Sequence, residues 1–245
     1  MDPRRRTWIA VLFALLLAQP SAALMIDSFN EGAINVLDVD PDGSPDVTAG
    51  ENSGLSTSET IGGVRYTTAR AFWQGTLMIA GQASVTSVPG PAGAAQMAAL
   101  WRGNFAFFYD GIADNTANTT DGALGLDLSS DSAFAVDVLN VSAGDAQIRI
   151  AVWDSDSGFT SLAIPAASGT NIIDFSEFSG IDFSDVQSIR LAVIDVFGQG
   201  FIGPGGSPLP GVLTIDRFYT VPEPGTALLL SLGLVGLAAR RRENR

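Results

Sequence analysis

The strongest constraint on the fold is a long series of short segments in which apolar and polar residues alternate. Alternation is clearest in 134–141, 147–153 and 188–196. A period of two residues places one side of an extended strand against a core. Nine further strand candidates are separated by Gly, Asp and Ser: 25–29, 34–39, 61–72, 76–88, 105–109, 124–128, 159–164, 171–175 and 212–218. The pattern predicts an all-β, two-sheet sandwich over residues 24–220.

Two local features of this domain carry further expectations. Residues 142–145 (Ser-Ala-Gly-Asp) form a tight-turn signal, so the strands on either side are expected to pair antiparallel. Residues 92–101 are the one helical candidate in the domain, and their Pro- and Gly-rich lead-in fits an ordered loop equally well.

The charge of the domain excludes one class of partner. The chain has 26 acidic residues; leaving out Asp2, Glu223 and Glu243 gives 23 acidic residues in 24–220, against six arginines, so the domain charge is −17. A domain this acidic is not expected to bind nucleic acid. The chain has no cysteine and no histidine. Disulfides, Ser-His-Asp or Cys-His catalysis and His or Cys metal sites are therefore excluded.

Carboxylates are the remaining catalytic groups. A pair of them can hydrolyse a glycosidic bond, but no local signature selects a pair among so many. The glutamates of the domain, Glu31, Glu51, Glu59 and Glu177, all lie in turn-like sequence. We expect no catalytic activity, and a glycoside-active enzyme remains an alternative.

One acidic segment matches half of a calcium-binding loop. Asp38, Asp40 and Asp42 stand at positions one, three and five, followed by a glycine at six and Asp46 at nine. Position twelve is Ala49, so the bidentate glutamate is missing. A weak calcium site and a solvated acidic turn are equally good interpretations. No cofactor is expected to be required, and a structural calcium ion is the open alternative.

The N-terminal segment 1–23 reads as a secretory signal peptide. It has a positive start at Arg4–Arg6, an apolar helix-forming stretch at 8–18, and small residues at 21–23. We expect a signal helix that is cut near Leu24.

The C-terminal segment 221–245 has three parts: a Pro-Glu-Pro turn, the uncharged apolar run 226–239, and an arginine cluster. Together they predict a transmembrane helix with a positive cytoplasmic flank. Residues 225–239 span only about 22 Å as a helix, against about 30 Å of hydrocarbon.

The order of these parts resembles the PEP-CTERM sorting signal of Gram-negative bacteria. The residues that carry the resemblance are Pro222, Glu223, Pro224, Arg240, Arg241 and Arg242. The resemblance implies recognition by an exosortase in the inner membrane, on the way to the cell surface or extracellular matrix. An ordinary C-terminal membrane anchor is the alternative.

The domain itself resembles galactose-binding-like jelly rolls, a group that includes many carbohydrate-binding modules. The resemblance rests on the opening strand 26–29, the segment 182–189 and the last strand 213–218. It implies a jelly-roll sandwich and, by analogy, a glycan ligand. The first and last strands of many such folds lie near a structural calcium, which makes Asp27 and Asp216 further candidate ligands.

A candidate glycan site follows from the strand pattern. In 147–153 every second residue from 148 is apolar and faces the core, so Arg149 and Trp153 face outward. By the same logic Asp137 and Arg190 face outward on their own strands. An aromatic ring beside charged hydrogen-bonding groups suits a sugar, whose C–H face stacks on the ring. The alternative is that a loop such as 198–211 covers Trp153 and that Arg149 pairs with an aspartate across strands.

These observations together predict a signal peptide at 1–23, a jelly-roll domain at 24–220 and a sorting signal at 221–245. The precursor is expected to be held in the inner membrane by its C-terminal helix and then moved to the cell surface or matrix. The expected role is structural or carbohydrate-binding, with an exosortase and an extracellular polysaccharide as partners. A purely structural surface protein without a glycan ligand remains an alternative.

Overall fold

The computed structural model describes residues 22–40, 48–72, 81–88, 93–100, 102–113, 122–142, 144–156, 158–198 and 210–223. Residues Leu24–Val221 form one compact unit. In the described ranges no helix is long and apolar enough to cross a bilayer. The expected signal helix and C-terminal helix, with Pro224 and the arginine cluster, fall outside the described residues.

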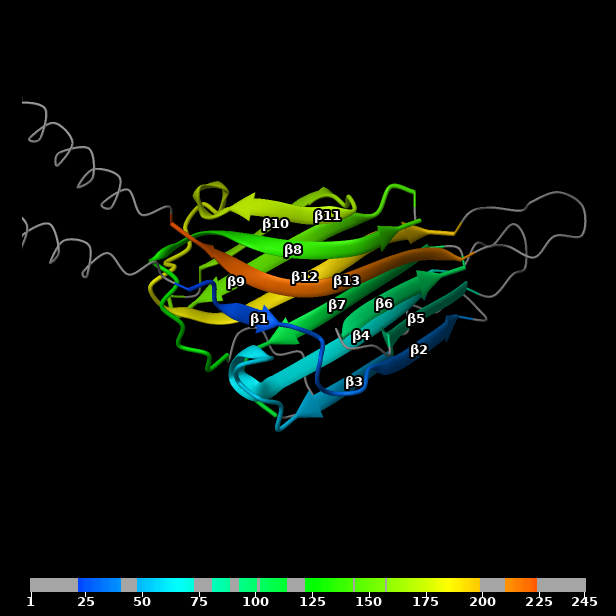
Figure 1. Ribbon diagram of the computed structural model, residues 1–245, viewed down its shortest axis with the longest axis horizontal. Helices are drawn as coiled ribbons and strands as arrows, with labels where there is room; N and C mark the ends of the chain where they lie inside the picture. Colours follow the sequence, from blue (N-terminus) through cyan, green and yellow to red (C-terminus); the bar gives the residue numbers. More distant parts are fainter. Residues whose placement is uncertain are drawn as a thin grey trace, which may run out of the picture. The chain divides into compact units, whose positions relative to one another are not determined.

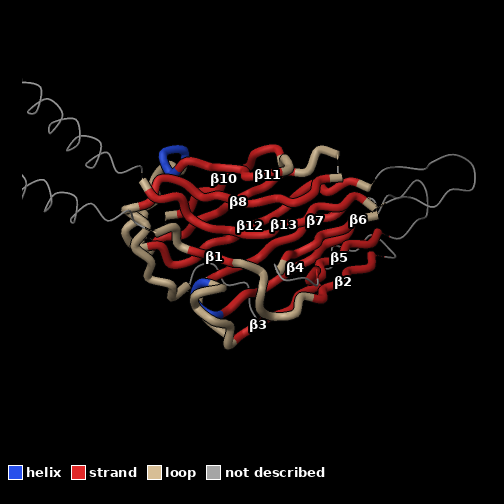
Figure 2. Tube along the Cα trace, in the orientation of Figure 1, coloured by secondary structure: helices blue, strands red, loops and turns tan. Residues whose placement is uncertain are grey.

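The unit consists of two antiparallel sheets, which confirms the all-β, two-sheet prediction (Figures 1 and 2). Sheet A is seven-stranded, in the order β11 (Gly169–Asp174), β8 (Asp131–Val141), β13 (Gly211–Pro222), β6 (Ala94–Ala99), β5 (Gly81–Val88) and β2 (Asn35–Asp40), with β1 (Met25–Asp27) paired to β13. Sheet B is six-stranded, in the order β10 (Phe159–Pro165), β9 (Gln147–Asp154), β12 (Val186–Phe197), β7 (Arg102–Tyr109), β4 (Val64–Phe72) and β3 (Thr48–Ser53). Two single 3-10 turns, Ile61–Gly63 and Phe175–Glu177, complete the described elements.

The core lies between the sheets and follows the predicted alternation. In β9 the side chains of Ile148, Ile150 and Val152 are fully buried. In β12 the alternation holds as far as Val193, after which a bulge changes the pairing register with β7. Val196 is again fully buried beyond this bulge, so the bulge restores the inward face after one extra residue.

Aromatic side chains fill one end of the core around Phe134. Its ring centroid lies 4.7 Å from Phe175, 5.7 Å from Phe178 and 5.7 Å from Phe218. These rings come from a 3-10 turn, the segment after it, and strand β13. The edge and tilted contacts are the geometries that aromatic quadrupoles favour.

The core also contains an ion pair. Arg65 of β4 donates from Nη1 to both carboxylate oxygens of Asp27, at 3.0 and 2.9 Å, and both side chains are fully buried. Tyr109 donates its hydroxyl to Asp27 at 2.9 Å, and the backbone N–H of Phe29 donates at 2.8 Å. Because Asp27 belongs to β1 of sheet A and Arg65 to sheet B, the pair joins the two sheets.

The predicted pairing across the turn at 142–145 is wrong. Strand β8 pairs with β11 in sheet A, while β9 pairs with β10 and β12 in sheet B. The turn therefore passes from one sheet to the other. A turn signal gives the position of a chain reversal, and it does not distinguish a hairpin from a crossover between two sheets.

Two element predictions also need correction, and one strand was missed. The helical candidate at 92–101 contains strand β6, whose small side chains pack closely between β5 and β13. Strand β3 was not predicted, because its sequence Thr-Ala-Gly-Glu-Asn-Ser has no apolar face. The predicted strand at 124–128 is irregular: Leu126 forms an isolated bridge with Val186, and the backbone N–H groups of Leu124 and Leu128 donate to the carbonyls of Gln187 and Phe183.

Candidate functional site

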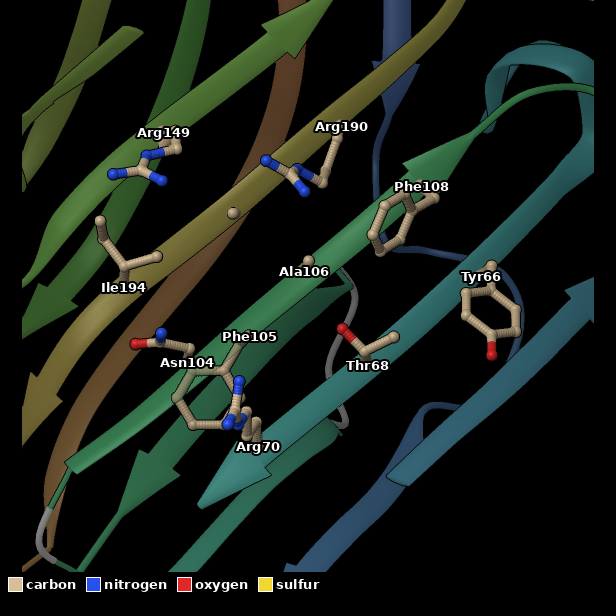
Figure 3. A pocket seen from close by; sticks show the side chains of 11 residues that line it. Tyr66, Thr68, Arg70, Asn104, Phe105, Ala106, Phe108, Arg149, Arg190 and Ile194 are labelled. Carbon is tan, nitrogen blue, oxygen red and sulfur yellow. The ribbon is translucent and has the colours of Figure 1, made fainter. Parts of the chain in front are cut away.

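The outer face of sheet B carries a shallow groove of about 420 Å³ (Figure 3). It is built on four neighbouring strands, β9, β12, β7 and β4. With strands about 4.8 Å apart, the groove crosses about 14 Å of sheet at right angles to the strands. Its lining side chains on β12, β7 and β4 form three rows, each row two residues further along the strands, and an aromatic pair from β9 and β10 lies beside the first row.

The first row is aromatic with one arginine. In this row Arg190 opposes Phe108, which opposes Tyr66. Trp153 opposes Phe159 on one side and Ser188 on the other, two residues before Arg190, so this aromatic pair lies beside the row and is not among the residues that line the groove. The rings of Trp153 and Phe159 lie 4.8 Å apart at 33°, and Phe159 is 53% exposed. The rings of Tyr66 and Phe108 contact edge to face at 6.1 Å.

Arg190 joins this row to the pair of Trp153 and Phe159 beside it. Its guanidinium carbon lies 5.7 Å from the Trp153 ring centroid and 5.6 Å from that of Phe108. Both distances are within the range of cation–π attraction. The row therefore presents aromatic rings and a fixed guanidinium side by side.

The middle row forms the floor. Ala192 of β12 opposes Arg149 on one side and Ala106 on the other, and Ala106 opposes Thr68 of β4. The two alanines have no side chain beyond Cβ, so the surface is hollow between Arg149 and Thr68. Figure 3 shows the longer side chains of the groove around Ala106.

The third row is polar. Asn104 of β7 opposes Arg70 of β4, and Ile194 of β12 completes the row. Asn104 accepts a hydrogen bond from the backbone N–H of Asp195 at 2.9 Å, which fixes its orientation. The guanidinium of Arg70 packs over the ring of Phe72 at 4.9 Å.

Three arginines therefore surround one hollow. Burial and the neighbouring charge of Arg149 lower the pKa of Arg190. An arginine nevertheless stays protonated at any physiological pH. The Nε atoms of Arg70 and Arg190 are buried and have no hydrogen-bond partner in the described part of the chain.

The structure brings together three of the four residues predicted for a glycan site: Arg149, Trp153 and Arg190. The fourth, Asp137, is not with them. It lies on β8 of sheet A, where it accepts hydrogen bonds of 2.7 Å from Thr170 and 2.7 Å from Arg217. The reason is the crossover at 142–145, which puts β8 and β9 in different sheets.

Of the alternative interpretation, only the pairing of Arg149 falls within the described residues; whether the loop at 198–211 covers Trp153 stays untested. Trp153 is half-buried and contacts Phe159 and Arg190. Arg149 forms no ion pair with any residue that the structure describes. Most of the loop at 198–211 lies outside the described residues.

The sequence interpretation missed the half of the groove that β4 and β7 supply. Tyr66, Thr68 and Arg70 are every second residue of β4, and their alternation with Thr67 and Ala69 was a usable signal. What the sequence did not provide was the position of β4 and β7 next to β12. That neighbourhood results from long-range pairing.

The described calcium candidates have structural partners. Asp38 is buried and accepts hydrogen bonds from the backbone N–H of Ala71 at 2.6 Å and from Thr48 Oγ1 at 3.1 Å. Asp27 is used by Arg65 and Tyr109, as described above. Asp216 lies 3.2 Å from Arg217 Nε.

No group of three acidic side chains in the described ranges is arranged to hold a metal ion. The side chain of Asp40, together with Asp42 and Asp46, lies outside the described residues. Calcium binding by that loop stays a prediction.

Comparison with solved structures gives weak likenesses. An exo-β-agarase matches with 12% identity and a TM-score of 0.36 over 59% of this chain and 23% of its own. A carbohydrate-binding module specific for non-crystalline cellulose matches with 11% identity and a TM-score of 0.31 over 56% of this chain and 81% of its own. A carbohydrate-binding module of the β-sandwich superfamily matches with 9% identity and a TM-score of 0.32 over 78% of this chain and 98% of its own.

The chain thus spans less than a quarter of the agarase, and scores this low do not bear on function. No curated protein matches the sequence. The C-terminal segment gives a defined match: residues 220–242 fit the PEP-CTERM protein-sorting motif, a range that contains all six predicted sorting residues. The chain therefore carries a PEP-CTERM sorting motif, which indicates export through an exosortase-type system to the cell surface.

Proposed function

We propose that the domain is a non-catalytic module that binds carbohydrate in the groove on the outer face of sheet B. The observation that carries the proposal is the first row of the groove, where Arg190 contacts Phe108 and also the ring of Trp153, whose pair with Phe159 lies just outside the groove. A pyranose ring has an apolar C–H face that stacks on an aromatic ring and hydroxyls that need paired hydrogen bonds. The row supplies both kinds of contact.

The shape of the groove supports an extended ligand. The hollow over Ala106 and Ala192 runs across the sheet between an aromatic row and a polar row. Its volume of about 420 Å³ falls in the range of ligand sites.

The chemistry of the lining favours binding over hydrolysis. Among the residues that the structure describes, the eleven that line the groove include no Asp and no Glu. Glycoside hydrolysis commonly needs two such carboxylates on either side of the bond. The groove supplies hydrogen-bond donors and aromatic faces in their place.

The sorting motif supplies the cellular setting for this proposal. In our proposal the precursor is held in the inner membrane of a Gram-negative bacterium and is processed by an exosortase. The mature protein then reaches the cell surface or extracellular matrix, where polysaccharide is its partner. Carbohydrate binding would hold the protein in that layer after the anchor is removed.

Affinity electrophoresis of the full-length protein through gels containing single polysaccharides tests the proposal. We expect at least one polysaccharide to retard the wild type and Trp153→Ala to abolish that retardation with a nearly unchanged unfolding midpoint. Tyr219→Ala, which removes an aromatic ring from sheet A, is the matched control and should leave the retardation intact. A large loss of stability without any loss of binding would mean that Trp153 is only a packing residue.

A further inference from the structure

The arginines of the domain divide into two groups by their partners. Arg65, Arg102 and Arg217 each form an ion pair with an aspartate. The other three, Arg70, Arg149 and Arg190, form no ion pair or hydrogen bond with any residue in the described ranges. All three of these line the groove.

This distribution is unusual for so acidic a domain. Residues 24–220 contain 23 acidic side chains and six arginines, so aspartate and glutamate are abundant as partners. Arg149 and Arg190 instead lie on neighbouring strands, and burial together with the charge of Arg149 lowers the pKa of Arg190. Within the described residues these three arginines have no counter-ion, and an anionic ligand would supply one.

We propose that the ligand of the groove is an acidic polysaccharide, whose carboxylate or sulfate groups the arginines bind. This inference rests on the proposed carbohydrate-binding function and adds the charge of the ligand. A guanidinium binds a carboxylate or sulfate through two parallel hydrogen bonds, and it does so in a fixed plane. A neutral glycan would supply no counter-ion to the three arginines.

The positions of the three arginines suit a repeating chain of charges. Arg149 stands at the β9 end of the floor, and Arg70 at the β4 side in the third row. Arg190 is held between Trp153 and Phe108 in the aromatic row. A polymer lying along the hollow therefore meets a guanidinium on each side, so acidic groups on successive sugars can be bound together.

The experiment compares polymers that differ only in charge. Affinity electrophoresis of the full-length protein would use polygalacturonate against its fully methyl-esterified form, and dextran sulfate against dextran. We expect tighter binding to the charged member of at least one pair, by about tenfold or more. The pair that shows the difference identifies carboxylate or sulfate as the recognised group.

Variants then assign the effect to the groove. Arg149→Gln should weaken binding to the charged polymer about tenfold or more, with Arg70→Gln as the second variant if the first lowers the unfolding midpoint. Arg217→Gln removes the same charge from sheet A and should leave the affinity unchanged. An equal loss with Arg217→Gln would mean diffuse charge attraction and would overturn the inference.

Two other outcomes separate this inference from the proposed function. Equal binding of charged and uncharged polymers, lost with Trp153→Ala and kept with Arg149→Gln, would overturn acidic recognition and leave carbohydrate binding intact. Retardation by none of the polymers, charged or neutral, would overturn both.

Discussion

At the scale of single residues, the buried pair of Asp27 and Arg65 holds the fold together at the start of the domain. Arg65 donates also to the backbone carbonyls of Glu31 and Gly32, each at 2.8 Å, so it fixes the segment that follows β1. Burial raises the pKa of Asp27 above its ordinary value, and the charge of Arg65 opposes that rise. The charge of Arg65 therefore lowers the energetic cost of an ionised Asp27 in the core.

Replacing Arg65 should destabilise the domain in a pH-dependent way. In Arg65→Met the buried carboxylate loses its counter-charge, and we expect the free energy of unfolding to fall by about 3–5 kcal/mol at neutral pH. The pKa of Asp27 then rises further in the folded state, so the variant binds a proton more tightly folded than unfolded. The free energy of unfolding of the variant should therefore be highest below the pKa that Asp27 has in the unfolded chain. It should decrease as the pH rises through the higher pKa that Asp27 has in the folded protein. Urea unfolding at several pH values between acid and neutral measures how the free energy of unfolding depends on pH.

The double variant Arg65→Met with Asp27→Leu is the control for that prediction. Because no charge remains buried, it should recover most of the lost stability and show no such pH dependence. A single variant as stable as the wild type at neutral pH would mean that the ion pair contributes nothing.

At the scale of elements, β2 is joined to sheet B through Asp38. Its carboxylate accepts the backbone N–H of Ala71 in β4 and the hydroxyl of Thr48 in β3. The edge strand of sheet A is thereby fixed to two strands of sheet B. The sequence also made Asp38 a candidate calcium ligand. A hydrogen-bond acceptor and a calcium ligand predict different effects when Asp38 is replaced.

Asp38→Ala should lower the free energy of unfolding by about 1–3 kcal/mol, because a buried backbone N–H loses its partner. The loss should be the same in chelator as in millimolar calcium. Asp38→Asn keeps an acceptor oxygen and should lose less. Urea unfolding of the three proteins in both buffers provides the measurement; a loss that appears only with calcium would restore the metal interpretation.

The elements also show how far sequence reasoning reaches. Period-two alternation predicted β8, β9 and β12 and their inward faces, because burial of one strand face is a local property of sequence. It therefore found Arg149, Trp153 and Arg190. It could not decide which strands lie side by side, since that depends on pairing between distant residues. Asp137 was misplaced and Tyr66 was missed for this single reason.

At the scale of the whole molecule, charge is distributed unevenly. The domain is strongly acidic, yet the three arginines that have no ion pair among the described residues lie together on the outer face of sheet B. Such a protein is repelled from acidic polymers at long range and attracted at short range through the groove. Salt weakens both the long-range repulsion and the short-range attraction, but it screens the charges that the ligand covers less than the exposed charges. Selectivity for a matching chain would thus come from contact, and general adhesion to acidic matrix would be suppressed.

The C-terminal motif gives the last prediction. An apolar run of about 22 Å is short for a bilayer of about 30 Å, which suits a segment that is recognised and removed better than a permanent anchor. We expect the cell-envelope form to lack the residues from Arg240 onward, and Glu223→Ala to leave uncut protein in the membrane. Mass spectrometry of the C-terminal peptide measures both in the same cells. An intact C-terminus on wild-type surface protein would identify the segment as a plain anchor, and the groove would then act on polysaccharide while still attached to the membrane.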